Sequence, residues 1–219
     1  MKTLLIPAML ALAAAPSFAQ SSNVYANVAG GFAVSPDGTS GDILGEVGVH
    51  LTPRLSVFGD IGQFHDLQPS TVQPSVDGTA ATLAAGGLSV TGVARAPAWY
   101  SMGGVRWTFP ENVRLTPYIF GGAGFARLTP SAKFTYNSGT LVGAATPPSS
   151  GDDVTSQLVS LGDFTQPAAS TAFMFSVGGG VEAPIAPHLV ADVGYRLSRV
   201  SADTPLNAQS VTFGVGYRF

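Results

Sequence analysis

Hydrophobicity alternates with a period of two along most of this sequence, and this feature limits the possible folds more than any other. In residues 210–219 one set of positions is apolar or aromatic and the other is small or polar. The first set is Val211, Phe213, Val215, Tyr217 and Phe219, and the second is Ser210, Thr212, Gly214, Gly216 and Arg218. Because successive side chains of a β-strand point to opposite faces, this pattern predicts a strand with one apolar and one polar face.

The same alternation predicts eight strands in all. They cover residues 23–34, 42–51, 55–62, 99–109, 115–128, 173–182, 189–197 and 210–219. The many glycines of the segment at 115–128 leave its facing ambiguous. We expect no amphipathic helix between these strands.

The predicted connections differ in length and composition. Short turns are expected at residues 52–54, 110–112 and 184–187. Longer connections are expected at 35–41, 65–97, 129–170 and 201–205, and the two at about 65–97 and 129–170 are long and rich in Ser, Thr, Gly, Pro and Asp. An even number of strands, with short turns at one end and long loops at the other, is typical of a bacterial outer-membrane barrel.

The chemistry of the two strand faces decides which way such a barrel would face. The apolar face carries large aromatic side chains such as Trp99 and Trp107, whereas the polar face carries the charges. A soluble barrel of eight strands would instead turn its apolar face inward around a ligand. We therefore predict an all-β fold, an eight-stranded antiparallel transmembrane up-and-down β-barrel, and expect a monomer. The last strand would close the barrel against the first, so that no strand edge lies in lipid.

The composition agrees with a membrane location. Only 11% of the residues are charged, against roughly 25% in a typical soluble domain. Yet no internal apolar run reaches the ~20 residues of a membrane helix. Lys2, the apolar stretch at 4–15 and the small residues Ser17 and Ala19 have the pattern of a secretory signal peptide. We expect cleavage after residue 19, with residues 20–219 reaching the cell outer membrane.

Two counts exclude classes of function. The sequence contains no cysteine, which excludes thiolate catalysis and thiolate metal sites. Acidic residues outnumber basic ones by 13 to 10, so nucleic acid is an implausible partner.

The predicted signal peptide, the alternating segments and the final GVGYRF resemble the small OmpA/OmpX-type outer-membrane barrels. This porin-like β-barrel domain family includes attachment and opacity-type adhesins, and the resemblance extends over the whole mature chain. It implies that Tyr217 and Phe219 belong to a signal in the last strand that the barrel assembly machinery reads. It says little about activity, because barrels of many functions share these features.

The charged residues on the polar face form the first group of candidate site residues. They are Glu46, Asp60, Glu182 and Asp192 together with Arg106, Arg196 and Arg218. Since side chains just fill the interior of an eight-stranded barrel, we interpret them as a structural network in the lumen, where each buried charge needs a partner. The alternative is a proton or ion path, or catalytic carboxylates.

No catalytic, cofactor or metal site is identifiable from the sequence. His50 and His188 fall near the short-turn end and His65 at the long-loop end, so the three histidines cannot meet at one metal ion. His65 and Asp66 lie where a hydrolase would work, but no motif selects a nucleophile among the loop serines. Clusters of glycine lack the following Lys-Ser/Thr and helix of a phosphate loop, and we interpret them as relief of crowding in a small barrel.

The long loops are where we expect the function to lie. Residues 133–136 and 140–142 flank a turn at Asn137-Ser138-Gly139 and predict a hairpin, so that the fifth and sixth strands continue above the membrane as a ribbon. An exposed ribbon edge can pair with a partner strand. We therefore expect a structural or adhesin-like role with a host or surface ligand. The alternatives are a barrel enzyme acting on lipid A or surface peptides at the outer rim, and a small-solute channel.

Cations near the long-loop ends form the second group of candidate residues. They are Arg95, Arg127, Lys133 and Arg199. The outer leaflet is rich in lipid phosphates, which guanidinium groups bind through paired donors. We expect some of these residues to contact lipopolysaccharide. The alternative is that they pair with loop aspartates, which contributes little to stability.

Overall fold

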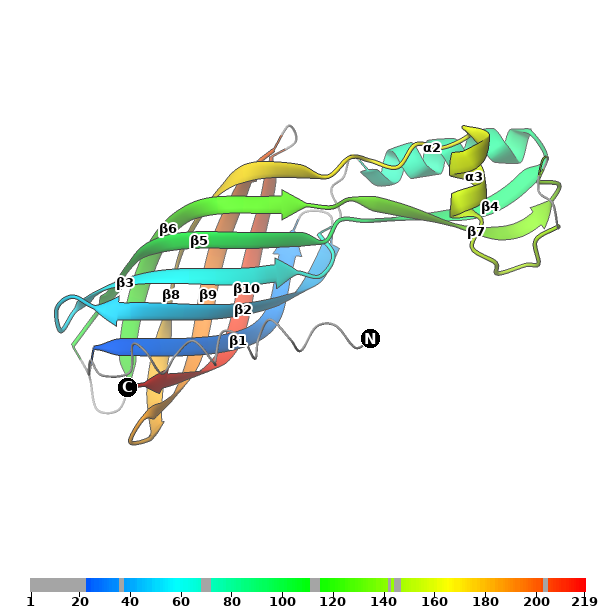
Figure 1. Cartoon of the computed structure of the whole chain (residues 1–219). Coiled ribbons are helices and arrows are strands. Elements are labelled where there is room, and N and C mark those ends of the chain that lie inside the picture. The colour runs from blue at the N-terminus through cyan, green and yellow to red at the C-terminus, as the bar shows by residue number, and fades with distance from the viewer. Residues whose placement is uncertain are drawn as a thin grey trace.

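Eight strands close into an antiparallel barrel in the order β1-β10-β9-β8-β6-β5-β3-β2 (Figure 1). The computed structural model describes residues 23–35, 38–67, 72–110, 115–141, 143, 147–202 and 205–219, so the predicted signal peptide lies outside it. The barrel strands are β1 (Val24–Ser35), β2 (Gly38–His50), β3 (Leu55–Phe64), β5 (Ala98–Thr108), β6 (Thr116–Leu128), β8 (Ser170–Ala186), β9 (Leu189–Ser201) and β10 (Leu206–Arg218). This confirms the predicted fold class.

Five barrel strands, β2, β3, β8, β9 and β10, are longer than the hydrophobic alternation predicted. β1 and β2 stay paired as far as Ser35 and Gly38, so the connection expected at 35–41 is shorter than predicted. Backbone pairing continues through Thr39 and Ser40, where polar side chains interrupt the apolar pattern. The ladder depends on main-chain groups, so it can extend beyond the apolar part of a strand.

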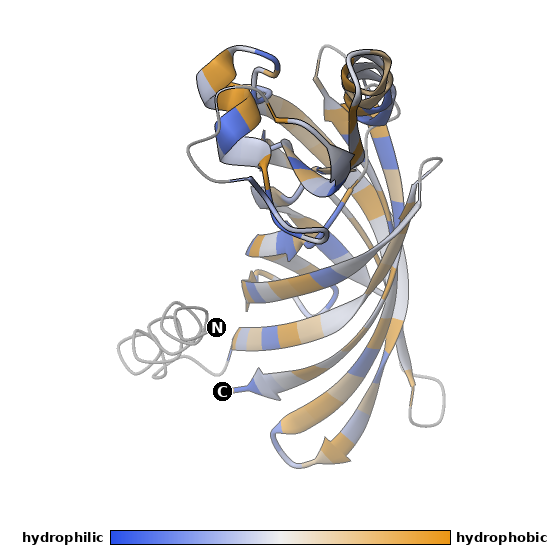
Figure 2. Ribbon diagram, turned by 90° about the vertical axis from the view of Figure 1, so that its right-hand side faces the viewer, coloured by the Kyte–Doolittle hydropathy of each residue, from blue (hydrophilic) through white to orange (hydrophobic). Residues whose placement is uncertain are grey.

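Large apolar side chains cover the outer wall of the barrel. Phe213 and Val215 of β10 are 57% and 53% exposed, whereas Ser210 and Thr212 on the other face are buried. Figure 2 shows the resulting alternation of hydrophobic and hydrophilic residues along the barrel strands. Water-soluble proteins rarely expose continuous apolar surface of this kind, so the wall is suited to hydrocarbon.

The facing of β6, which the sequence leaves ambiguous, is resolved by the structure. Ile119 and Phe125 are 52% and 63% exposed on the outer wall, and Tyr118 and Ala126 are buried inside. Glycines on the inner face of this strand allow close approach of its neighbours: a Cβ on Gly124 would lie only 2.0 Å from the carbonyl oxygen of Ser101. Glycine here relieves crowding, as expected for a small, strongly curved barrel.

The interior of the barrel is layered along its axis. At the end nearer the long connections it is filled by apolar side chains, among which Phe64, Tyr100 and Met174 are at most 2% exposed. Charged and hydroxyl side chains occupy the middle. At the short-turn end the interior opens into a cavity of about 570 Å3, and a space of only about 20 Å3 lies further in.

Beyond the barrel rim, the two long connections form a folded unit that we call the outer module. It consists of α2 (Val72–Ala85), β4 (Leu88–Arg95), β7 (Ser131–Gly139) and α3 (Thr155–Leu161). β4 and β7 pair as an antiparallel two-stranded ribbon that extends away from the barrel, with both helices close to it (Figure 1).

The ribbon corrects the hairpin predicted within residues 133–142. β7 forms as a strand, but its partner is β4 from the other long connection. The pairing register of the barrel continues into the ribbon. Ala98 of β5 faces Leu128 of β6, and three residues further from the barrel on each strand Arg95 faces Ser131. The ribbon therefore prolongs β5 and β6, which are the fourth and fifth barrel strands along the chain rather than the predicted fifth and sixth.

The expectation of no amphipathic helix between the strands was wrong for α2. α2 places Val72, Val76, Ala80 and Leu83 on the face toward the module core, at helical spacing. Pro74, Gly78 and the alanines on its other faces hide this stripe in the sequence. Within the described residues, neither helix is long and apolar enough to cross a membrane.

Candidate functional site

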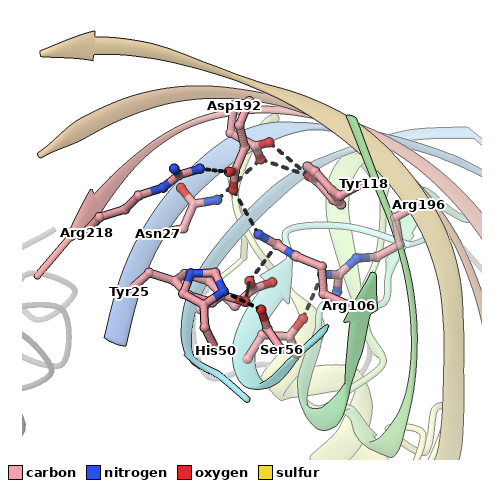
Figure 3. A network of polar contacts seen from close by, with 12 residues as sticks. Tyr25, Asn27, His50, Ser56, Arg106, Tyr118, Asp192, Arg196 and Arg218 are labelled. Atoms are coloured by element: carbon pink, nitrogen blue, oxygen red, sulfur yellow. Dashed lines mark hydrogen bonds and ion pairs between the residues drawn. The ribbon is translucent and has the colours of Figure 1, made fainter. Parts of the chain in front are cut away.

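Arg106 is at the centre of the lumen network, which Figure 3 shows from close by. Its guanidinium donates to Glu46 Oε1 at 2.6 Å from one nitrogen and to Glu182 Oε1 at 3.0 Å from another. The same guanidinium lies over the rings of Tyr25 and Tyr118, with centroid distances of 5.1 and 4.2 Å. Residues from β1, β2, β5, β6 and β8 thus meet at one buried cation, which links strands that are distant in sequence.

The second buried arginine makes a separate ion pair. Arg196 donates to Asp60 Oδ2 at 2.7 Å, and the side chain of Asp60 is fully buried. Asp192 is held differently: it accepts from the Tyr118 hydroxyl at 2.9 Å and from the Asn27 amide at 3.3 Å. Buried carboxylates are costly unless they are hydrogen-bonded, and each of these has such donors.

Sequence reasoning missed the tyrosines of the network and also Asp42. Tyr25 donates to Glu46 at 3.0 Å and Tyr100 donates to Asp42 at 3.3 Å. The signal was available, because Asp42 alternates in register with Glu46 on the inner face of β2. The tyrosines were overlooked because only the charged residues of the polar face were taken as members of the network.

The network reaches solvent at the short-turn end. Arg218 pairs with Glu182, which also holds Arg106, and both Arg218 and Glu182 line the 570 Å3 cavity. His50 lines this cavity as well, and its Nδ1 lies 2.7 Å from the hydroxyl of Ser56. This end of the lumen is therefore open, whereas the opposite end is closed by the apolar layer.

The pair His65 and Asp66 lies at the rim near the outer module. One oxygen of the Asp66 carboxylate accepts the main-chain N–H of Ala96 at 3.0 Å, and the Asp66 N–H donates to Ser40 Oγ at 2.9 Å. The Ser40 hydroxyl in turn donates to the Gly41 carbonyl. These contacts attach the base of β4 to the rim. Among the described residues, no group of three or more His, Asp or Glu side chains could hold a metal ion.

Tyr217 and Phe219 lie on the outer wall at the short-turn end. Tyr217 stacks on His188 with ring centroids 5.7 Å apart and contacts Phe219 edge-on at 4.9 Å. The Phe219 N–H donates to the carbonyl of Val24 at 3.0 Å, next to the ladder between β10 and β1. The pair therefore forms part of an aromatic cluster at the seam where the barrel closes.

The outer module has an apolar core of its own. Val76 of α2, Phe134 of β7 and Leu158 of α3 are fully buried in it, and Phe164 packs edge-on against Phe134 at 4.9 Å. These residues lie on one face of the ribbon, covered by the helices and the chain around them. The module is thus an ordered unit, which distinguishes it from a loop that only shields the rim.

The β7 edge of the ribbon is covered by the same chain. The Phe134 N–H donates to Thr155 Oγ1 at 2.8 Å, and its carbonyl accepts from the Val154 N–H at 3.0 Å. The side-chain amide of Gln166 bonds both main-chain groups of Ala132, at 3.0 and 2.9 Å. The prediction of an exposed edge that pairs with a partner strand is therefore wrong for β7.

At the other edge, Gln73 fastens α2 to β4. Its side chain accepts from the Ala94 N–H at 2.9 Å and donates to the Gly92 carbonyl at 3.2 Å. Gly92 is also the point of closest approach, since a Cβ there would lie 2.3 Å from Cγ1 of Val76 and 3.0 Å from a ring carbon of Phe134.

We expect Gly92→Val to loosen α2 from the ribbon, because the added side chain overlaps Val76 and overpacking costs about 1 to 3 kcal/mol. Limited proteolysis should cut α2 faster while the barrel remains resistant. Gly78→Ala is the matched control, because a Cβ at Gly78 meets no atom within 4 Å. Equal cleavage rates in Gly92→Val and the unaltered protein would contradict the packing described here.

The second group of predicted site residues lies on outward faces. Arg95, Arg127 and Lys133 are exposed on the side of β4, β6 and β7 that continues the outer wall, and Arg199 is exposed on β9. Lys133 Nζ lies 3.6 Å from Asp153 Oδ2, but both side chains are more than half exposed. Hydrogen bonds from the hydroxyl and N–H of Thr155 hold the pKa of Asp153 below its ordinary value. The Asp153 carboxylate therefore has good donors even without Lys133.

A closed eight-stranded antiparallel barrel with an apolar outer wall and a charged, hydrogen-bonded interior defines an integral β-barrel protein of the outer membrane. The chain belongs to the outer membrane protein beta-barrel domain family, which matches residues 5–219.

Solved structures of other outer-membrane proteins are similar to this chain at low sequence identity. Neisserial surface protein A (NspA) is 16% identical, with 91% of this chain and 98% of that chain covered and a TM-score of 0.53. Ail, the attachment invasion locus protein of Yersinia pestis, is 14% identical, with coverages of 90% and 97% and a TM-score of 0.45. The N-terminal β-barrel domain of Pseudomonas aeruginosa OprF is 14% identical, with coverages of 91% and 98% and a TM-score of 0.47. No curated protein matches the sequence.

Proposed function

We propose that this protein is a non-enzymatic, adhesin-like surface protein that binds a host or surface ligand through the outer module. The observation that carries the proposal is the apolar core of the module, which is separate from the packing inside the barrel. Ordering a segment of this length costs conformational entropy, and a loop that only shielded the rim would not need it. A binding surface benefits from an ordered core, because a rigid surface loses less entropy when it binds a ligand.

Helix α3 offers the apolar contact that such a surface requires. Val159 and Leu161 are 41% and 42% exposed, although their neighbour Leu158 is fully buried in the module core. The helix lies well beyond the barrel, so these side chains are not part of the lipid-facing wall (Figure 1). Exposed apolar side chains on an ordered element outside the lipid-facing wall offer contact area to a protein partner.

The test compares adhesion of cells that display the protein with that of variants altered on this one helix. We expect a Gram-negative host displaying the full chain to bind cultured epithelial monolayers better than the host alone. Val159→Ser combined with Leu161→Ser should lower the gain about tenfold, since removal of an interface anchor costs more than about 1.4 kcal/mol. Ser156→Ala with Ser160→Ala, which alters exposed residues of the same helix, should leave it unchanged.

Two outcomes would count against this proposal. Adhesion no better than that of the empty host would contradict an adhesin-like role toward epithelial cells. Full adhesion by the Val159 and Leu161 double variant would show that the contact lies elsewhere on the module. Surface display of each variant has to be measured, so that loss of binding is not loss of protein.

A further inference from the structure

The ribbon of the outer module has a second face, opposite its core, which is open and polar. Along β4 and β7 the side chains that alternate with the core residues are Ser89, Thr91, Val93, Arg95, Ser131, Lys133, Thr135 and Asn137. All of them are exposed or half-buried, and Asn137 donates to the Thr91 hydroxyl at 3.0 Å across the two strands. We call these residues the ribbon face.

The ribbon face is a direct continuation of the lipid-facing wall. The register of β5 and β6 runs into β4 and β7 without a shift as far as Val90, and a shift follows between Val90 and Ser89. Up to that point, side chains that point outward on the barrel strands stay on the same side in the ribbon. From the barrel outward, the side chains of this face are Phe125, Arg127, Ser131, Lys133 and Thr135 on β6 and β7, and Trp99, Arg95, Val93 and Thr91 on β5 and β4. The surface is thus aromatic on the barrel, and on the ribbon it carries cationic and hydroxyl-bearing side chains.

We call the ribbon face together with the adjoining outward face of β5 and β6 the strip. All charged side chains that these four strands place on the strip are cationic. Arg95, Arg127 and Lys133 lie on it, and the sequences of β4, β5, β6 and β7 contain no acidic residue. Arg95 faces Ser131, and Lys133 is two residues further along the same strand. Such diagonal neighbours lie about 7 to 8 Å apart, so two long cationic side chains there can reach one phosphate group.

We propose that the ribbon face binds the phosphorylated sugars of lipopolysaccharide beside the barrel. Of the molecules that can lie against a surface continuous with the lipid wall, this lipid has acyl chains that suit the aromatic part and phosphates and sugars that suit the cationic and hydroxyl-bearing part. Guanidinium groups bind phosphate through paired donors, and the hydroxyl and amide groups further out suit sugar hydroxyls. The ion pair of Lys133 with Asp153 does not oppose this, because a pair so exposed contributes little.

This inference is independent of the adhesin-like role, since the ligand lies in the same membrane and contacts the face of the ribbon opposite its core. Arg199 is excluded from the strip because it lies on β9, which β8 separates from β6. It provides an internal comparison, as an outward-facing cation near the same rim without the ribbon beside it.

The test uses the full mature chain refolded into vesicles of phosphatidylcholine with either lipopolysaccharide or an equal charge of phosphatidylglycerol. The melting temperature of the barrel should rise with lipopolysaccharide and much less with phosphatidylglycerol. Neutralising the strip with Arg95→Gln, Arg127→Gln and Lys133→Gln should remove most of this rise. Arg54→Gln, which changes an exposed arginine in a turn at the opposite end, and Arg199→Gln should retain it.

A second variant addresses the sugars. Thr91→Val with Thr135→Val should reduce the rise caused by lipopolysaccharide with a full core oligosaccharide, and should not alter the rise caused by lipid A alone. The proposal is overturned if the triple variant keeps the full rise, or if phosphatidylglycerol produces the same rise as lipopolysaccharide. Loss of the rise in Arg54→Gln would also overturn it, since any cation would then serve.

Discussion

Val177→Arg should destabilise the refolded barrel by about 2 to 4 kcal/mol, which is the cost of placing arginine on the lipid face near the bilayer midplane. Val177 is 49% exposed on the outer wall and lies near the middle of β8. In the register of the sheet its neighbours are Gly121 and Leu197. None of these side chains can pair with a cation, so the guanidinium would have to be solvated by deforming the bilayer or the barrel.

The control for this substitution is a valine of similar exposure outside the barrel. Val159 of α3 is 41% exposed and is also a valine, but it lies on the outer module beyond the barrel (Figure 1). Val159→Arg should therefore change stability by no more than about 0.5 kcal/mol, as is usual for a surface position. Unfolding in urea from lipid vesicles measures both free energies. Equal effects of the two substitutions would mean that the apolar wall does not face lipid.

The barrel strands were predictable because the alternation of outward and inward side chains is a local property of each strand. Each outward residue of β10, such as Phe213, alternates with an inward one such as Thr212, and this can be read without knowing any partner strand. The positions of Glu46 and Arg106 on the inner face follow from the same rule. Which carboxylate each arginine contacts does not follow from it, because that depends on the stagger of strands that are distant in sequence.

The outer module was not predictable because its strand pairing also depends on segments that are distant in sequence. β7 is flanked by turn-forming residues that suggest a local hairpin, but its partner β4 is held in place by the pairing of β5 with β6. A ladder that is already formed extends at little entropic cost, so the long-range pair wins over the local one. Helix α2 has an apolar face of its own, but Pro74 and Gly78 obscure that pattern in the sequence. Contacts of Gln73 and Val76 hold the helix against the ribbon.

The lumen network should be the most sensitive part of the interior. Arg106→Met should cost about 3 to 5 kcal/mol, the usual effect of removing one partner of a buried ion pair. Its main consequence falls on Glu46, whose side chain is only 4% exposed and would lose its cation. Glu182 suffers less, because it keeps Arg218 and lies at the open cavity. Arg54→Met, in an exposed turn, should have little effect.

A double variant distinguishes two causes of the stability loss in Arg106→Met: an unpaired buried charge on Glu46, and the loss of the contacts that the arginine makes. If the cost of Arg106→Met comes from leaving Glu46 charged and unpaired, then adding Glu46→Gln should restore most of the stability, since the amide can still accept from Tyr25. If the cost comes from lost packing of the arginine between Tyr25 and Tyr118, the second substitution should restore nothing. We expect restoration, because an uncompensated buried charge is more costly than the loss of two cation–π contacts. Urea unfolding of the two variants and of Glu46→Gln alone gives the coupling free energy.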